Sequence, residues 1–509
     1  MFSSIYSADV AGMEARLICI EADVHDGLPV FDMVGYLASA VKEARERVRI
    51  AIRNMGVHFP AKRITVNLSP ANLRKEGTSF DLPIAISLLT AFGFLSTECT
   101  KDILIIGELG LDGSLRPVKG VLAMILEGRR QGIRRFVVPD KNAGEGAVLE
   151  DIEIYGMQTL VQTMKFLRGE CPLKPVRASF QKWRKEQAYP QDFSDIIGQG
   201  TAKRAAEIAI GGRHNLLMIG PSGSGKTMLA KRLPTIMPAM DLEESLEITR
   251  LYSICGLLPE EDSVITRRPF RAPHHTITQT ALTGGGRIPM PGEITLAAKG
   301  VLFLDELPEF SRSSLEVLRQ PLEEHKVTVS RLGKSYEYPS DCIFVAAMNP
   351  CRCGYFPDRK RCRCTTGEIQ RYLGKISEPL LDRMDLCVET GMPDFSLYGR
   401  GDECSAQIRR RVEKAVRIQK KRYRKESFSY NGALPEQLLH KHCPTGEEEQ
   451  EYLNLFFEEE QCSMRRITRV IRVARTIADL EESECISEEH LTEAMRFRSV
   501  DRSYWGVSL

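Results

Sequence analysis

The segment GPSGSGKT holds the residue types that bind a nucleotide phosphate, at the spacing G-x-x-x-x-G-K-[ST]. Its residues are Gly220, Pro221, Ser222, Gly223, Ser224, Gly225, Lys226 and Thr227. Glycines let successive backbone N–H groups surround a phosphate, the lysine reaches the β and γ phosphates, and the threonine hydroxyl binds Mg²⁺. An apolar run precedes the segment and a helix-like run follows it, which is the context this loop requires. The alternative is a chance Gly/Ser turn, and we predict ATP and Mg²⁺ as cofactors.

Two further strand-like runs end in polar residues. VLFL is followed by Asp305 and Glu306, and IFVAAM is followed by Asn349. Continuous apolar runs are typical of buried parallel strands. We predict that Asp305 binds the metal, that Glu306 is the general base for water, and that Asn349 orients that water. The alternatives without a catalytic role are a surface turn for Asp305 and Glu306 and a strand-end cap for Asn349.

Four cysteines lie close together in CRCGYFPDRKRCRC (351–364). They are Cys351, Cys353, Cys362 and Cys364, out of 14 cysteines in the chain. Four thiolates form the tetrahedral shell that structural Zn²⁺ prefers, although the usual spacing is Cys-x-x-Cys rather than Cys-x-Cys. We predict a zinc site, and an iron–sulfur cluster, a redox pair or no metal remain as alternatives. Because the loop leaves from Asn349, a metal would stiffen the path towards the segment near Arg383.

Composition places the chain among ordinary globular proteins. It has 509 residues, 42% hydrophobic and 27% charged, with a net charge of only +2, so any basic surface must be local. The first residues lack the pattern of a signal peptide, and the longest apolar run, 82–96, is too short to span a bilayer. We expect a cytoplasmic protein without a membrane partner.

The elements that must position these residues fall into an α/β multidomain arrangement. Residues 1–165 alternate strand and helix patterns, including a hairpin signal at Asp112-Gly113. Residues 166–191 lose periodicity and gain Lys, Arg and Pro, as a linker does. Residues 192–395 alternate again, which predicts a parallel sheet, and residues 396–509 are helical, with helices near 404–425, 463–482 and 487–497.

Several long motifs, rather than single residues, indicate a resemblance to a known family. RPFRAPHHTIT (268–278), GGGRIPMPGEITLAAKGVLFLDELPEF (284–310), NPCRCG (349–354) and VARTIADL (473–480) resemble the ComM/YifB family of magnesium-chelatase-like AAA+ ATPases along nearly the whole chain. The resemblance implies an AAA+ P-loop core with a C-terminal helical lid, and a ring, usually hexameric, that hydrolyses ATP between subunits. It also implies that Arg383, in LLDRMDL, is an arginine finger and that Arg465, in SMRRITRV, is a second-sensor arginine. Arg466 is adjacent, and the alternative for each arginine is a surface ion pair.

The N-terminal part, 1–165, resembles the Lon-protease-like domain of this family, with the ribosomal-protein-S5-type α/β fold. Ser79 falls near the nucleophile position of true Lon proteases, whereas the lysine position is held by Leu122 and Lys119 lies about one helical turn earlier. A Ser–Lys pair needs hydrogen-bond contact. We therefore expect no proteolysis.

Three function classes remain open. The family resemblance implies a motor acting on DNA, single-stranded or branched, in recombination or natural transformation. The alternatives are a chelatase-type protein-remodelling ATPase and a protease-associated unfoldase. Two segments are candidates for DNA contact in a central channel: 268–292, expected as an exposed loop, and 323–338, expected as a hairpin turning at 332–334. Their cations are Arg267, Arg268, Arg271, Arg287, Lys326, Arg331 and Lys334. Arg45, Arg49 and Arg53 share a helix face and form a weaker candidate, because such faces are commonly just solvated.

Overall fold

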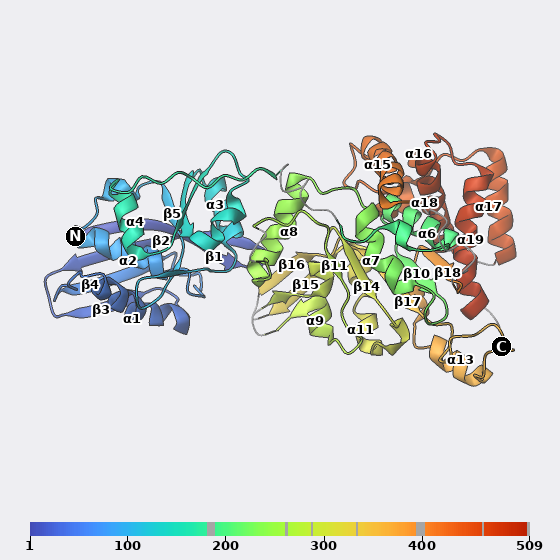
Figure 1. Ribbon diagram of the computed structural model, residues 1–509, viewed down its shortest axis with the longest axis horizontal. Helices are drawn as coiled ribbons and strands as arrows, with labels where there is room; N and C mark the ends of the chain where they lie inside the picture. The colour runs from blue at the N-terminus through green and yellow to red at the C-terminus, as the bar shows by residue number, and fades with distance from the viewer. Residues whose placement is uncertain are drawn as a thin grey trace. The chain divides into compact units, whose positions relative to one another are not determined.

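The computed structural model describes residues 1–180, 189–259, 263–286, 289–331, 334–392, 403–460 and 463–505 (Figure 1). The chain forms two compact units. The first comprises Met1–Glu186 and Asp241–Thr266, and the second comprises Gln187–Met240 and Arg267–Leu509. Among the described residues, no helix is both long and apolar enough to cross a bilayer.

The first unit is built on a seven-stranded mixed sheet in the order β3-β4-β2-β1-β5-β8-β9. The strands are β1 (Phe2–Ala11), β2 (Glu14–His25), β3 (Val30–Val34), β4 (Arg63–Ser69), β5 (Ile103–Ile105), β8 (Arg135–Pro139) and β9 (Glu153–Met157). Buried and exposed residues alternate along β1 and β2, as in strands with one face on a core. The expected hairpin around Asp112-Gly113 forms between β6 (Glu108–Leu109) and β7 (Leu115–Arg116).

Within the described residues, the helices of this unit are α1 (Ser39–Asn54), α2 (Asp81–Ala91), α3 (Val121–Arg130), α4 (Leu160–Leu167) and α8 (Leu242–Cys255). Every residue of α2 is buried, as the uninterrupted apolar run predicts. In α1 the buried stripe is Val41, Ala44, Val48 and Ala51, completed by Ile52. The arginines of α1 expected on another face, Arg45, Arg49 and Arg53, are exposed.

Helix α8 packs with the first unit, although its residues lie within the 192–395 range that the sequence predicts to form one core. Ser253 donates its hydroxyl proton to Glu145 at 2.6 Å, and the backbone N–H of Gly120 donates to the carbonyl of Ser253 at 3.0 Å. The chain therefore contributes two separate stretches to each unit. Contact between α8 and α3, rather than position in the sequence, decides this grouping.

The second unit contains the predicted parallel sheet, in the order β11-β14-β17-β10-β18. Its strands are β10 (Leu216–Ile219), β11 (Phe270–Arg271), β14 (Val301–Leu304), β17 (Ile343–Met348) and β18 (Leu386–Glu389). All residues of β10, β14 and β17 are buried, because helices cover both faces of such a sheet. Two of these helices are α6 (Gly200–Gly212) and α7 (Lys226–Ile236).

Short elements connect the strands of the second unit. The helices are α9 (Gln279–Thr283), α10 (Glu293–Leu296), α11 (Arg312–Glu316), α12 (Arg319–Glu324), α13 (Thr366–Leu373) and α14 (Glu378–Leu381), whereas the short α16 (Leu439–His442) follows the last strand. Two antiparallel pairs also form: β12 (Gly284–Gly285) with β13 (Met290–Pro291), and β15 (Lys326–Arg331) with β16 (Lys334–Pro339).

The C-terminal part of this unit is helical, as predicted. Its long helices are α15 (Ser405–Arg422), α17 (Glu447–Glu460), α18 (Met464–Leu480) and α19 (Glu488–Trp505), drawn in orange and red in Figure 1. Val412 of α15 and Val470 of α18 belong to the same apolar core as Leu216 of β10. These C-terminal helices, termed the lid helices, thus share one core with the sheet.

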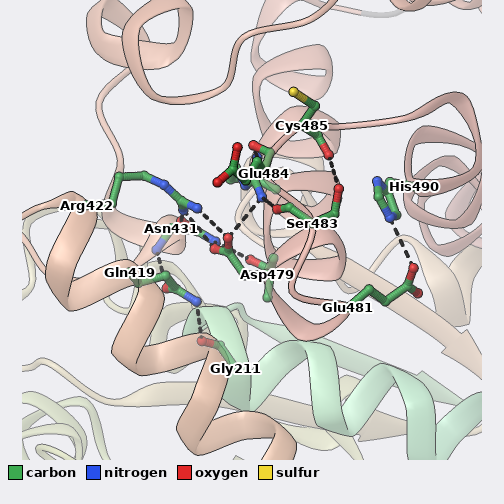
Figure 2. A network of polar contacts seen from close by, with 12 residues as sticks. Gly211, Gln419, Arg422, Asn431, Asp479, Glu481, Ser483, Glu484, Cys485 and His490 are labelled. Atoms are coloured by element: carbon green, nitrogen blue, oxygen red, sulfur yellow. Dashed lines mark hydrogen bonds and ion pairs between the residues drawn. The ribbon is translucent and has the colours of Figure 1, made fainter.

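A buried polar network connects the lid helices to one another and to α6 (Figure 2). Asp479, which is fully buried, accepts hydrogen bonds from Arg422 at 2.8 Å, Asn431 at 2.8 Å and Arg475 at 3.0 Å. Gln419 donates to the carbonyl of Gly211 in α6 at 2.9 Å. Buried charges persist only when they are paired and hydrogen-bonded, and this network meets that condition.

Candidate functional site

The predicted nucleotide-binding residues follow the ends of adjacent strands at one edge of the sheet. Ile219, the last residue of β10, lies opposite Met348 of β17 and Glu389 of β18. The phosphate-binding loop, Asn349 and Thr390 therefore leave the sheet at the same level. In open α/β sheets, ligands bind at this carboxyl edge.

The loop between β10 and α7 has the backbone that its glycines permit. Gly223 and Gly225 have φ angles of 81° and 88°, a region that other residues adopt only with strain. Lys226 is 8% exposed, and its Nζ donates to the carbonyls of Gly220 and Pro221, both at 2.8 Å. Burial lowers the pKa of Lys226, which the nearby Asp305 carboxylate opposes. The lysine thus lies folded back over the loop that would hold a phosphate.

Thr227 and Asp305 lie in contact although they are 78 positions apart in the sequence. The Thr227 hydroxyl donates to Asp305 Oδ2 at 2.6 Å. A hydroxyl and a carboxylate side by side are hard oxygen ligands of the kind Mg²⁺ takes. These residues therefore fit the predicted metal-binding pair.

Asn349 and Glu306 complete the predicted set in different ways. Asn349 Oδ1 lies 3.3 Å from the Nζ of Lys226, so the asparagine reaches the phosphate loop. The Glu306 side chain is 62% exposed, and its Oε2 atom lies 3.8 Å from the Nδ1 atom of His275. Glu306 has a φ angle of 52°, in the left-handed region. Strained backbone of this kind is concentrated at functional sites.

The two predicted arginines lie elsewhere in the second unit. Arg383 donates to the carbonyls of Arg319 at 2.9 Å and Pro379 at 2.7 Å, and it pairs with Glu323. It precedes β18, at the edge of the sheet opposite the phosphate loop. Arg465 is exposed in the first turn of α18, whereas the neighbouring Arg466 donates to the carbonyl of Arg498 at 2.7 Å.

Gln199 and Thr390, which no sequence motif marks, support the phosphate loop through hydrogen bonds. Gln199 donates to the carbonyl of Ser224 at 3.2 Å and to that of Gly391 at 2.6 Å, and Ser224 Oγ lies 2.8 Å from the hydroxyl of Thr390. Next to Gly391 lies a pocket of about 660 Å³, lined by Gly200, Thr201, Arg204, Glu389, Glu493 and Phe497 among others. Gln199 follows an Ile-Gly step in a segment without a recognised motif, so only its contacts reveal it.

The four clustered cysteines converge. Their Sγ atoms all lie within 4.8 Å of one another, and three pairs are separated by 3.3, 3.6 and 3.8 Å. Sulfur atoms around a tetrahedral zinc are about 3.8 Å apart, given Zn–S bonds of about 2.3 Å. The separations exceed a disulfide bond, and the thiols are free. Burial raises the pKa of the Cys353 thiol, but hydrogen bonds from the backbone of Tyr355 and Arg363 outweigh it and lower that pKa to about 6.

The basic segments differ from their expected form. Residues 268–292 are not simply an exposed loop, since they contain β11, α9, β12 and β13. Arg268 is buried and donates to the carbonyls of Pro238 and Lys299, at 2.6 and 2.7 Å, and Arg271 pairs with Glu293. Arg267 is exposed and stacks on Tyr189, while Arg287 lies outside the described residues. Arg268 and Arg271, two of the four arginines proposed for DNA contact in this segment, are therefore bound by backbone carbonyls and by a carboxylate.

The expected hairpin at 323–338 forms as the antiparallel strands β15 and β16, in which the backbone of Arg331 lies opposite that of Lys334. Lys326 at its base forms an ion pair with Glu337 at 3.0 Å. Of the three proposed turn residues, Leu332 and Gly333 lie outside the described part of the chain, and Lys334 begins β16. The hairpin is thus present, with its tip undescribed.

The first unit offers no Ser–Lys pair at the expected place. Ser79 is 5% exposed and its carbonyl accepts from Gly107, whereas Lys119 is exposed. Within the described residues, these two side chains make no hydrogen bond to each other. Leu122, at the position of the missing lysine, is fully buried.

Comparison with known proteins covers nearly the whole chain. Residues 192–396 match the family described as magnesium chelatase, subunit ChlI, residues 20–142 match subunit ChlI of Mg-chelatase, and residues 402–498 match the ChlI C-terminal family. Competence protein ComM of Haemophilus influenzae is 41% identical over 507 residues, covering 98% of this chain and 97% of that protein. YifB of Escherichia coli is 39% identical over 506 residues, with the same coverage. A DNA repair protein RadA of Halalkalibacterium halodurans is 26% identical over 166 residues, 32% of this chain and 36% of that protein. The chain belongs to the ComM/YifB family of magnesium-chelatase-like proteins.

Proposed function

We propose that this protein is an ATPase that works as a ring-shaped motor on DNA. The observation that carries the ATPase part is the meeting of Lys226, Thr227, Asp305 and Asn349 at one edge of the parallel sheet, through contacts of 2.6 and 3.3 Å. These are the groups that phosphoryl transfer needs: a cation for the phosphates, oxygen ligands for Mg²⁺ and a polar group for water.

Each residue has a distinct role in this proposal. Lys226 neutralises the β and γ phosphates, and Thr227 and Asp305 hold Mg²⁺. Glu306 accepts a proton from the attacking water, which Asn349 orients. Bound Mg²⁺ supplies charge that stabilises the developing negative charge on the phosphate oxygens. The pocket beside Gly391 would receive the remainder of the nucleotide, since Gln199 bridges Gly391 and Ser224 of the loop.

The ring is proposed because Arg383, the proposed arginine finger, lies far from the phosphate loop of its own chain. Arg383 precedes β18 and the phosphate loop follows β10, and the two strands run parallel. A strand of four residues is about 13 Å long, so Arg383 lies too far from the loop of its own chain. We propose that it reaches the nucleotide of a neighbouring copy, in a hexameric ring, and that Arg465 acts from the lid.

DNA as the substrate rests on relatives and on local charge. The relatives include a competence protein and a DNA repair protein. The β15–β16 hairpin carries Lys326 and Lys334, and the net charge of only +2 requires local patches of this kind. Single-stranded or branched DNA would lie in the ring's channel, with contacts to phosphates that weaken steeply with salt.

Zinc is proposed for the cysteine cluster, because the sulfur separations match a tetrahedral shell. Cys351, Cys353, Cys362 and Cys364 would hold it, and it would act structurally. Gly354, inside this loop, lies against the phosphate loop: a Cβ atom built on Gly354 would be 3.7 Å from the backbone nitrogen of Ser222. The metal would therefore support the surface on which the phosphate loop rests.

The test is the rate of ATP hydrolysis with no DNA and with single-stranded, double-stranded and branched DNA. We expect at least one form of DNA to raise turnover, and we expect the Glu306→Gln variant to bind ATP yet hydrolyse almost none. If the unmodified protein does not hydrolyse ATP, the ATPase assignment is wrong. If it hydrolyses ATP but no DNA alters the rate, a chelatase-type motor that remodels a partner protein becomes the better proposal.

A further inference from the structure

His275 lies beside the proposed general base because of the strand register. Arg271 of β11 is paired with Leu302 of β14 in a parallel arrangement. Four residues beyond these partners along each chain are His275 and Glu306. The register thus brings an imidazole and a carboxylate to the same height at the carboxyl edge, and His275 Nδ1 lies 3.8 Å from Glu306 Oε2.

Two ring contacts hold the imidazole in place, and two hydrogen bonds fix the backbone that carries it. Its ring faces that of His274, with centroids 4.0 Å apart, and meets the buried Phe310 ring edge-on at 6.4 Å. The segment carrying it closes in a turn, in which Ile277 N–H donates to the carbonyl of His274 at 3.0 Å. The carbonyl of Ile277 also accepts from Ser314 at the start of α11, at 3.1 Å. Because His275 is only about one-third exposed, its ring has few alternative positions.

The Glu306 carboxylate needs a partner to hold it in place more than the Asp305 carboxylate does. Asp305 is held by the hydroxyl of Thr227. The Glu306 carboxylate is 62% exposed, and His275 Nδ1 lies 3.8 Å from it, whereas Tyr372 interacts with its charge without forming an ion pair. A carboxylate on a mobile side chain spends little time aimed at one water molecule, and misplacing a reacting group by about 1 Å can cost roughly 100-fold in rate.

We propose that His275 is a positioning residue for hydrolysis, which orients the Glu306 carboxylate through its Nδ1 atom. This inference rests on the proposed ATPase function. The distance of 3.8 Å is slightly longer than a hydrogen bond, so a small rotation of the exposed Glu306 side chain closes it. Catalytic hydrogen bonds are commonly long before substrate binds and tighten in the complex. His275 itself would not touch the nucleotide.

The test compares substitutions that keep or remove the donor at the Nδ1 position. Asparagine places its side-chain nitrogen where His places Nδ1, whereas glutamine places its nitrogen nearer to Nε2. We expect His275→Ala to lower kcat roughly 10- to 100-fold, with the Kd for ATP unchanged, and His275→Asn to recover more of kcat than His275→Gln. His440→Ala is the control, because His440 is an exposed histidine outside the proposed site, and we expect it to leave kcat unchanged.

The outcomes separate this inference from the proposed function. If Glu306→Gln is inactive and His275→Ala turns over normally, only the positioning role is wrong. If His275→Ala weakens ATP binding as much as it lowers kcat, or His275→Asn recovers no more than His275→Gln, the residue is structural and the inference is overturned. If the unmodified protein does not hydrolyse ATP, both proposals fall together.

Discussion

At the scale of single residues, the contact between Thr227 and Asp305 gives a direct test of metal binding. Thr227→Val keeps the shape of the side chain but removes the hydroxyl that donates to Asp305 at 2.6 Å. We expect a higher Mg²⁺ concentration for half-maximal ATP hydrolysis, together with a lower rate at saturation. Thr227→Ser retains the hydroxyl and serves as the control. Equal Mg²⁺ dependence in the valine and serine variants would contradict the assignment.

His214 is a second residue with a testable consequence, in this case for stability against pH. It is fully buried, its Nε2 lies 2.7 Å from the Thr476 hydroxyl, and burial lowers its pKa to about 4. The unfolded chain, with a histidine pKa of about 6.5, binds more protons between pH 6.5 and 4. The contribution of the neutral, buried His214 to the free energy of unfolding should therefore be fully present above pH 6.5. It should fall by up to about 3 kcal/mol as the pH drops through this window.

The measurement is the thermal unfolding midpoint of the protein between pH 7 and 4. His214→Gln cannot gain a proton, so we expect its midpoint to decline less steeply than that of the unmodified protein. His440→Gln, at an exposed histidine, should leave the slope unchanged. Parallel slopes for His214→Gln and the unmodified protein would show that His214 does not set this dependence.

At the scale of elements, the cysteine loop should bind metal and support the phosphate loop. We expect about one zinc per chain, since four Sγ atoms lie within 4.8 Å of one another. Replacing Cys351 and Cys362 with Ser should remove the metal and raise the KM for ATP, because Gly354 rests against Pro221 and Ser222. Metal analysis and ATPase assays measure this, with Cys485→Ser as the control at an exposed, isolated cysteine. Zinc-free protein after anaerobic purification, with no uptake of added zinc, would refute the site.

The helices of the lid depend on one buried carboxylate. Asp479 accepts from Arg422 of α15, Arg475 of α18 and Asn431 of a short 3₁₀ turn (Asn431–Ala433) (Figure 2). Asp479→Asn keeps the shape but leaves two arginines without their counter-charge, which should cost about 3 kcal/mol of stability. The exposed pair of Glu482 and Lys414 provides the control, because Glu482→Gln should change stability by less than about 0.5 kcal/mol. Urea unfolding of both variants makes the comparison, and similar midpoints would argue against a supporting role for the network.

At the scale of the whole molecule, a ring predicts that two inactive variants can complement each other. Arg383→Ala subunits should assemble yet hydrolyse poorly, by roughly 10³-fold or more if Arg383 acts as a finger. Lys226→Ala subunits lack the phosphate-binding cation but keep the finger. Mixed rings should regain some activity, because some interfaces then combine an intact loop with an intact finger. No recovery after confirmed subunit exchange would mean that Arg383 does not act between copies.

The sequence by itself determined the features that depend on local backbone and residue type. A glycine-rich loop between an apolar strand and a helix, acidic residues after VLFL, the β15–β16 hairpin and the amphipathic helices α15 and α18 are all encoded within short windows, so periodicity and motif reveal them. The four cysteines belong to the same class, because fourteen residues of chain already bring the thiols near one another.

The tertiary structure decided the contacts between distant segments. The register of β11 against β14 places His275 beside Glu306, and the fold places Gln199 against Ser224 and Gly391. Packing against α3 groups α8 with the first unit, and burial turns Arg268 from a candidate DNA contact into a donor to backbone carbonyls. Residue type and spacing do not encode which strands are neighbours, nor which cations are buried, since both follow from burying apolar surface across the whole chain.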